Sequence, residues 1–319
     1  MYNEELKTRY IVDSTKSIKT ANNIKAVFNA TTKYEKELGS DICTMSAQEL
    51  QPIIDNILGI RSNSKYAQIA ILKEYFKWCR LNNYPGAGDG IANITIVGLG
   101  KVRKQMVSNP RHLQEYLDAL YEKETEETLD NVYRCYLWMA YMGIKEDDAL
   151  EIKSSDVDLS NMIINHNEIE FLIYREALPA FRNAVELKTF NYIHPGYKAK
   201  VIKRDRVEGD TILRGVKTGV SKQTIRVVVS NKHLTAEKNG RKGTNQNLSY
   251  SRIQLSGLFY RMAELERAGL PISFSSIAVS DTDGKAYSFG ERESIKQRQN
   301  RKERNYQRDY EQWKLAFSI

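Results

Sequence analysis

The regular spacing of apolar residues is the feature that most constrains the fold of this chain. In one segment they recur every three or four positions, at Leu129, Val132, Tyr133, Tyr136, Leu137, Ala140 and Tyr141. A helix has 3.6 residues per turn, so this spacing places the side chains on one face that packs against a core. We therefore predict a buried helix here, within a mainly helical protein.

The first hundred residues carry the same helical spacing. Apolar positions recur from Ile18 to Phe28 and again from Ile69 to Cys79. Ser46-Ala-Gln-Glu49 has the form of a capping box, and Ser62-Asn-Ser-Lys65 opens a further helix. These patterns predict an N-terminal helical domain.

A glycine-rich stretch between residues 85 and 100 interrupts the helical pattern. It lacks the Gly-Lys-Ser/Thr that follows the glycines of a nucleotide-binding loop, so a flexible connection is the better interpretation. We expect a helical domain over residues 1–100, a basic linker over residues 101–109 and a second domain over residues 110–319.

The second domain is predicted to be α+β with a small β component. Extended patterns at residues 162–165 and 169–174 indicate a β-hairpin, and the β-branched run 224–229 indicates another strand. Helices are expected over three segments: residues 177–190, 251–268 and 291–316.

Positive charge is concentrated in one segment. Residues 196–244 carry 13 basic and 4 acidic side chains, whereas the whole chain has a net charge of +8. A concentrated positive charge attracts a polyanion, because it neutralises phosphates and releases counterions. The alternative interpretation is a solvated basic loop.

Several classes of protein are disfavoured by composition. No apolar run approaches the length of a membrane span, and the polar N-terminus predicts no signal peptide. Cys43, Cys79 and Cys135 are scattered, which fits buried thiols in a reducing cytoplasm. The four histidines show no ligand spacing, so we expect neither a metal nor a cofactor.

Residues 142–158 resemble a motif of the tyrosine recombinases (phage integrases). That family has a Gly-x-Arg-x-x-Glu-x-x-x-Leu box and an Asp-x-Asp before a β-hairpin, and Gly143, Leu150, Asp156 and Asp158 match it. The order of the elements that follow is also similar. The resemblance implies a SAM-like helical core-binding domain followed by an α+β recombinase-like domain.

Departures from the recombinase pattern predict that strand cleavage has been lost. Lys145 stands where the family has its first arginine, and Ser251-Arg-Ile-Gln254 puts Ser251 and Gln254 at a histidine and an arginine position. Neither lysine nor glutamine offers a planar, bidentate guanidinium to a phosphoryl group. Losing one such donor typically costs about 100- to 1000-fold in rate. Arg252 could supply part of the missing charge.

Tyr306 and Tyr310 occupy the region where the resemblance implies a nucleophile. Their spacing of four continues through Trp313 and Phe317, which is more typical of a helix face that packs against its domain. We regard both tyrosines as vestigial candidates.

A narrower resemblance links residues 256–262 and 309–317 to the phage lytic-cycle repressors of Bacillus-type temperate phages, the MrpR-like family. It implies a DNA-binding repressor that maintains lysogeny on DNA in the cytoplasm of the bacterial host. The implied partners are a duplex operator, a second copy of the chain on DNA, and an antagonist protein or peptide.

The predicted DNA contacts are basic or polar side chains distributed over both domains. They are Asn63, Ser64, Lys65, Lys101, Arg103, Lys104, Lys145, Lys198, Lys200, Lys203, Arg204, Arg206, Lys217, Lys222, Arg226, Arg241, Lys242 and Arg252. Most would contact phosphates, which gives affinity and position but little sequence information.

Two further functions remain open from the sequence alone. One is an active recombinase or integrase, supported by Lys145 or Arg252. The other is a recombination accessory or architectural protein that bends DNA. An RNA-binding protein is disfavoured, because the tyrosines fall mostly on helix faces rather than in strand-borne stacking motifs.

Overall fold

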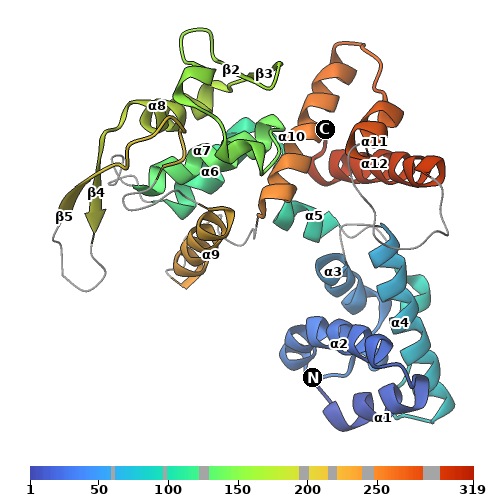
Figure 1. Cartoon of the computed structure of the whole chain (residues 1–319). Helices are drawn as coiled ribbons and strands as arrows, with labels where there is room; N and C mark the ends of the chain where they lie inside the picture. The colour runs from blue at the N-terminus through green and yellow to red at the C-terminus, as the bar shows by residue number, and fades with distance from the viewer. Residues whose placement is uncertain are drawn as a thin grey trace. The chain divides into compact units, whose positions relative to one another are not determined.

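The computed structural model describes residues 1–58, 62–95, 99–121, 129–193, 201–214, 221–238, 248–282 and 295–319. The chain forms two compact units (Figure 1). Unit 1 comprises Met1–Arg103 together with Ser273–Ile319, and unit 2 comprises Lys104–Ile272. The described protein is mainly helical with a small β component, as the sequence predicted. The β component forms two small antiparallel sheets.

Unit 1 is helical. Its longer helices are α1 (Glu4–Ser14), α2 (Ile18–Leu38), α3 (Ala47–Ile57), α4 (Ser62–Leu81), α11 (Phe274–Thr282) and α12 (Ile295–Phe317). The 3-10 turns η1 (Ile42–Thr44) and η2 (Gly90–Asn93) lie between them, and α5 (Leu99–Gln105) ends at the boundary with unit 2. The predicted capping box is present, with Ser46 and Glu49 bonding reciprocally at the start of α3.

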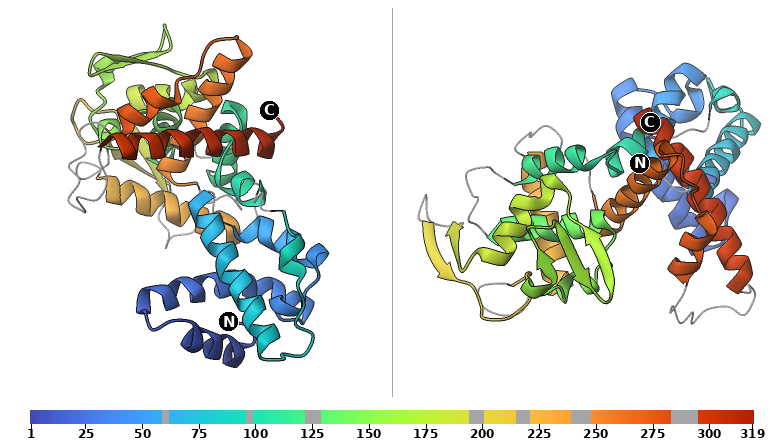
Figure 2. Two further views of the ribbon diagram at one scale, coloured as in Figure 1. Left: turned by 90° about the vertical axis from the view of Figure 1, so that its right-hand side faces the viewer. Right: turned by 90° about the horizontal axis from the view of Figure 1, so that it is seen from above.

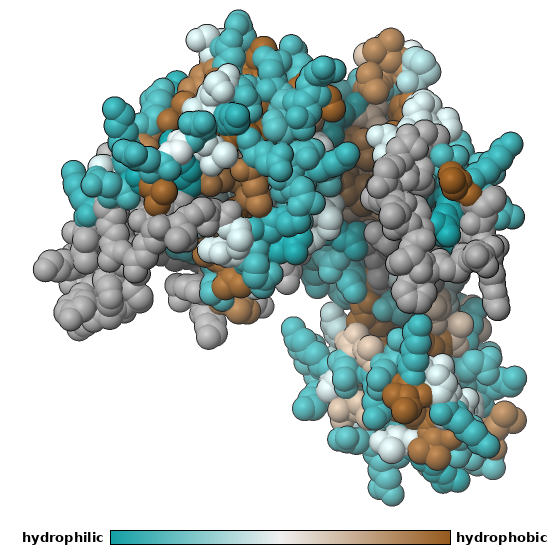
Figure 3. Space-filling view, viewed as in Figure 1, coloured by the Kyte–Doolittle hydropathy of each residue, from teal (hydrophilic) through white to brown (hydrophobic). Residues whose placement is uncertain are grey.

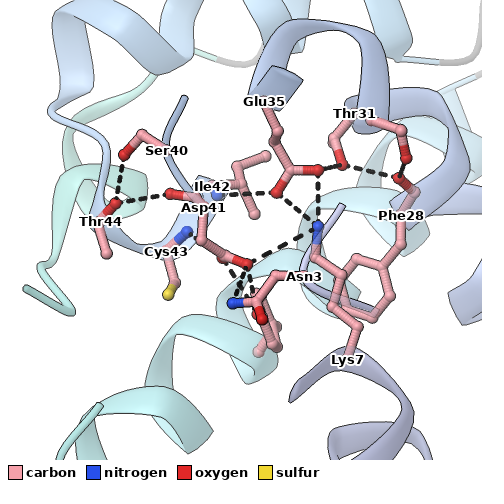
Figure 4. Close-up of polar contacts among 12 residues, drawn as sticks. Asn3, Lys7, Phe28, Thr31, Glu35, Ser40, Asp41, Ile42, Cys43 and Thr44 are labelled. Carbon is pink, nitrogen blue, oxygen red and sulfur yellow. Dashed lines mark hydrogen bonds and ion pairs between the residues drawn. The ribbon is translucent and has the colours of Figure 1, made fainter. Parts of the chain in front are cut away.

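A buried ion pair joins α1 to α2 in unit 1 (Figure 4). Lys7 Nζ lies 2.5 and 2.6 Å from the two carboxylate oxygens of Glu35, and both side chains are fully buried. Asp41 Oδ2 lies 3.9 Å from the same ammonium group and accepts a hydrogen bond from Tyr75. Burial raises the pKa of the Glu35 carboxyl, and the charge of Lys7 offsets part of that rise.

Unit 2 combines helices with both sheets. Its helices are α6 (Pro110–Leu120), α7 (Leu129–Met142), α8 (Leu178–Glu186), α9 (Lys222–Lys238) and α10 (Tyr250–Arg267), and its short 3-10 turns are η4 (Asp148–Leu150), η5 (Ser154–Asp156) and η6 (Arg175–Ala177). Strands β1 (Val157–Asp158), β2 (Ile163–His166) and β3 (Ile169–Leu172) form one sheet in the order β1-β2-β3. Strands β4 (Thr189–Ile193) and β5 (Val201–Asp205) form a separate two-stranded ribbon, seen at the edge of the unit in Figure 2.

The core of unit 2 is built on α7, whose residues from Tyr133 to Met142 are almost all buried. The periodicity that predicted this helix is therefore confirmed. Helix α10 packs against α7 so closely that a Cβ atom at Gly257 would lie 1.8 Å from the carbonyl oxygen of Tyr141. Only glycine permits this approach of two helix backbones.

Two sequence predictions in unit 2 need correction. Residues 224–229, predicted as a strand, lie within α9, because Ile225 is buried and Val228 and Val229 pack on the same core at helical spacing. Residues 177–190, predicted as one helix, divide into η6, α8 and β4. The predicted hairpin is confirmed as β2 and β3, with positive φ angles at Asn167 and Glu168 in its two-residue turn.

The C-terminal segment belongs to unit 1. Helices α11 and α12 lie side by side (Figures 1 and 2) and group with the first 103 residues. The sequence-based division had placed residues 110–319 in a single domain. Packing of α12 on α4, with a hydrogen bond from Lys65 to Gln312, accounts for the different grouping.

The described surface is largely hydrophilic in the view of Figure 3. Among the helices in the described ranges, none is both long and apolar enough to span a bilayer.

Candidate nucleic-acid interface

Three of the predicted contact residues meet where α7 ends and α9 begins. Lys145 is exposed in the turn after α7, while Lys222 and Arg226 lie on the first two turns of α9. Lys222 forms an ion pair with Asp147, and Arg226 binds both carboxylate oxygens of Glu146, with Nε 2.7 Å from Oε1. We refer to these five residues as the turn cluster.

The turn cluster is charged at neutral pH. Partial burial opposes ionisation of Glu146, but hydrogen bonds from Arg226 and Tyr136 outweigh it and hold the pKa of that carboxyl below its ordinary value. The same carboxylate raises the pKa of Arg226. Three cations therefore face two anions, which leaves one net positive charge. A phosphate at this surface would compete with Glu146 and Asp147 for the two α9 cations.

The carbonyl groups at the end of α7 are satisfied by side chains of α10. Gln254 Nε2 donates to the carbonyl oxygens of Gly143 and Ile144, both at 3.2 Å, and Tyr250 Oη donates to Ile144 at 2.9 Å. Arg261 donates to Tyr141 at 2.6 Å. Gly143 ends the helix with a φ of +101°, which favours glycine. A side chain at this position would also clash with the guanidinium of Arg261.

Gln254, which the resemblance aligned with a recombinase arginine, therefore has a structural role. Its amide is neutral and binds backbone carbonyls, so it supplies no positive charge to a phosphoryl group. Ser251 is exposed at the start of α10, with its hydroxyl 3.2 Å from that of Ser249. Arg252 is half-buried on the same helix.

The ribbon of β4 and β5 carries two further predicted contacts. Lys203 is exposed opposite Asn191, and Arg204 follows on β5 opposite Phe190. A two-stranded ribbon is one of the elements that fit the major groove of B-DNA.

Arg206 anchors this ribbon and is not available to a phosphate. Its guanidinium is buried and donates to the carbonyl oxygens of Ala184 at 2.5 Å, Leu187 at 3.3 Å and Ile212. Burial lowers its pKa to about 10. The predicted DNA contact at Arg206 is thus corrected, because the end of α8 needs a donor for its unpaired carbonyls.

The predicted DNA contact at Lys65 is also wrong. Its side chain is buried in unit 1, where Nζ donates to Oε1 of Gln312 at 2.5 Å, and burial lowers its pKa. Lys65 shares a helix face with Ile69 and Leu72, four and seven residues later, which explains why it points inward. Ser64 is exposed next to it, and Asn63 lies on the first turn of α4.

The predicted basic linker is largely helical. Lys101, Arg103 and Lys104 all lie on α5. Lys101 Nζ donates to the carbonyl oxygen of Ile57 at 3.3 Å, and Arg103 Nε donates to that of Ala316 at 2.6 Å. Arg103 and Lys104 are exposed. Five other predicted contacts lie outside the described residues: Lys198, Lys200, Lys217, Arg241 and Lys242.

The vestigial tyrosines lie on α12. Tyr310 is 1% exposed and stacks on Trp313, with ring centroids 6.1 Å apart and an interplanar angle of 18°. Phe274 of α11 covers it from a second side, at 6.0 Å. The prediction that this face packs against the domain is confirmed for Tyr310. Tyr306, one turn earlier, is half-buried.

Sequence reasoning missed the acidic half of the turn cluster. Glu146 and Asp147 adjoin Lys145 in the chain, but their partners lie 80 and 75 residues away on α9. The available signal in the sequence was that Glu146 and Asp147 directly follow Lys145. Because residues 224–229 were predicted as a strand, the basic residues that pair with these acids were not placed on a helix beside them.

Comparison with known families agrees with this description for the N-terminal part of the chain. Residues 1–81 match the family model described as the N-terminal core-binding domain of MrpR. The match covers α1 to α4, about a quarter of the chain. No curated protein matches the sequence. The helical N-terminal domain is therefore similar to the core-binding domain of MrpR, the family that the sequence resembles.

Proposed function

We propose that this protein is a sequence-specific, duplex-DNA-binding transcriptional repressor of a temperate phage. It is derived from a tyrosine recombinase, maintains lysogeny in the cytoplasm of the host, and does not cleave DNA strands. The similarity of residues 1–81 to the MrpR core-binding domain supports the lineage.

One observation carries the proposal most directly. Gln254 stands where the recombinase pattern has an arginine, and its amide is bound to the backbone at the end of α7. Lys145, at the other arginine position, is a point charge without the bidentate geometry of a guanidinium. These substitutions favour binding to a phosphate over stabilisation of the charge that develops on it during cleavage.

Binding would rely on exposed cations. In unit 2, Lys145, Lys203 and Arg226 are exposed and Lys222 is half-buried. Lys222 and Arg226 already pair with carboxylates, so each would exchange a carboxylate for a phosphate. Each phosphate neutralised releases a counterion, so affinity should fall as salt rises.

Genome-wide mapping of the DNA bound in a host that carries this gene, before and after induction of the prophage, tests the repressor role. We expect sites at promoters, with occupancy lost on induction. Sites confined to recombination ends would instead favour an accessory or architectural protein.

A suicide duplex substrate tests the loss of cleavage, because a recombinase would be trapped on it through a phosphotyrosyl bond. We expect no covalent adduct. An adduct that disappears in Tyr306→Phe would show an active recombinase and would refute the proposal, and Tyr310→Phe serves as the matched control.

A further inference from the structure

The N-terminal two thirds of α12 are strongly basic. Residues 295–308 contain six basic side chains and one acidic side chain, and none of these residues is among the contacts predicted from the sequence. The acid, Glu303, is half-buried.

The other end of α12 is fixed within unit 1. Tyr310, Trp313 and Ala316 are buried, and the packing is reinforced by two hydrogen bonds: Lys65 donates to Gln312, and Arg103 donates to the carbonyl of Ala316. The apolar side of the helix is thereby occupied inside its own unit.

The opposite side of α12 is exposed, and its exposed side chains share one chemistry between residues 296 and 308; Ile295, Glu311 and Leu315 are exposed outside that range. Successive turns present side chains that are all basic or carboxamide: Lys296, Gln297, Asn300, Arg301, Arg304 and Gln307. Positions 296, 300, 304 and 307 follow one another at spacings of three and four, so they form a single stripe along the helix. We call this set the α12 polar face.

We propose that the α12 polar face is a base-reading element that enters the major groove of duplex DNA. The proposal rests on the DNA-binding function above and adds a site for sequence recognition. The major groove of B-DNA is wide enough for one α-helix. Fourteen residues of helix are about 21 Å long, which is enough to follow several base pairs.

The carboxamide groups favour base reading over simple phosphate contact. Arginine pairs with two acceptors of guanine, and asparagine or glutamine pairs with the donor and acceptor of adenine. A surface that bound only phosphates would need positive charge alone. Arg304 Nε donates to the backbone carbonyl oxygen of Asn300 at 3.2 Å, which holds the guanidinium along the centre of the stripe.

A membrane surface fits this helix less well than DNA. A helix that lies on a bilayer inserts an apolar face beside its basic face. Tyr310 and Trp313 of α12 are instead buried within unit 1, where Tyr310 contacts Phe274 of α11.

Selection of duplexes from a random-sequence pool provides the test. The wild-type protein selects a motif, and the selection is repeated with Asn300→Ala and with Arg304→Ala. Arg111→Ala removes an equal charge from the exposed first turn of α6 and serves as the control for charge. Thermal unfolding checks that the variants fold as the wild type does, which is expected for exposed side chains.

We expect each α12 variant to bind the wild-type motif about 5- to 100-fold more weakly and to lose preference at one or two base positions. Arg111→Ala should retain both. If the α12 variants select the same motif as the wild type, base reading by α12 is overturned, whether their affinity stays the same or falls equally for all sequences. That result would leave the proposal of DNA binding intact. Failure of the wild type to bind any duplex would overturn both proposals.

Discussion

Substitution of Gly257 tests how α10 holds the end of α7. An alanine Cβ would lie 1.8 Å from Tyr141 O, whereas ordinary contact begins near 3.4 Å, so the two backbones would have to separate by about 1.6 Å. Forcing extra volume into a packed core costs about 1–3 kcal/mol. Three side chains of α10 would also lose hydrogen bonds to α7: Tyr250, Gln254 and Arg261.

Each of those hydrogen bonds contributes about 0.5–1.5 kcal/mol. Alanine regains about 0.5–1 kcal/mol through its better helix propensity, which does not offset the loss. We expect Gly257→Ala to lower the free energy of unfolding of unit 2 by about 4 kcal/mol, near the middle of the range that these contributions give. Because Lys145 follows the displaced end of α7, DNA affinity should fall as well.

Urea denaturation followed by circular dichroism measures this loss. Gly88→Ala is the control, since nothing lies within 4 Å of a Cβ atom at Gly88, and its effect should stay within about 0.5 kcal/mol. A loss below about 1 kcal/mol for Gly257→Ala would refute the close packing of α7 and α10.

Three further predictions follow from buried or paired charges. Because the pKa of Glu35 is raised in the folded protein, the stability of the wild type relative to Glu35→Gln should increase as pH falls from 7 towards the ordinary carboxyl value of 4.5. Chemical denaturation of both proteins at several pH values measures this difference, and a difference independent of pH would contradict it. Arg206→Lys should lower the unfolding free energy by about 1–3 kcal/mol in urea melts, since lysine cannot reach three carbonyls; wild-type stability would count against the anchor. Glu146→Gln with Asp147→Asn should raise duplex affinity about fivefold, roughly 1 kcal/mol, by fluorescence anisotropy; unchanged affinity would remove the turn cluster from the DNA site.

The parts of the fold that depend on local pattern could be predicted from the sequence. The apolar spacing around α7, the capping box of α3 and the β2–β3 hairpin are encoded within a few neighbouring residues. In contrast, α9 contains a β-branched run whose intrinsic preference is extended. Burial of Ile225 against the core overrides that preference, which no local rule could anticipate.

The candidate site was harder to predict because it depends on distant contacts. Whether a basic side chain is exposed cannot be read from the sequence. Arg206 is buried, and nothing in the neighbouring sequence shows which carbonyl groups accept its hydrogen bonds. Lys65 was predictable in part, since its spacing to Ile69 and Leu72 places it on the buried face of α4. The ion pairs of the turn cluster join residues 75 and 80 positions apart.

The salt dependence of duplex binding tests the central claim most directly, because it reports phosphate contacts whatever the operator sequence. If Lys145, Lys203, Lys222 and Arg226 each neutralise a phosphate, the logarithm of the association constant should fall with the logarithm of salt concentration with a slope of about −3 to −4. Absence of duplex binding at low salt, or a slope close to zero, would contradict the account.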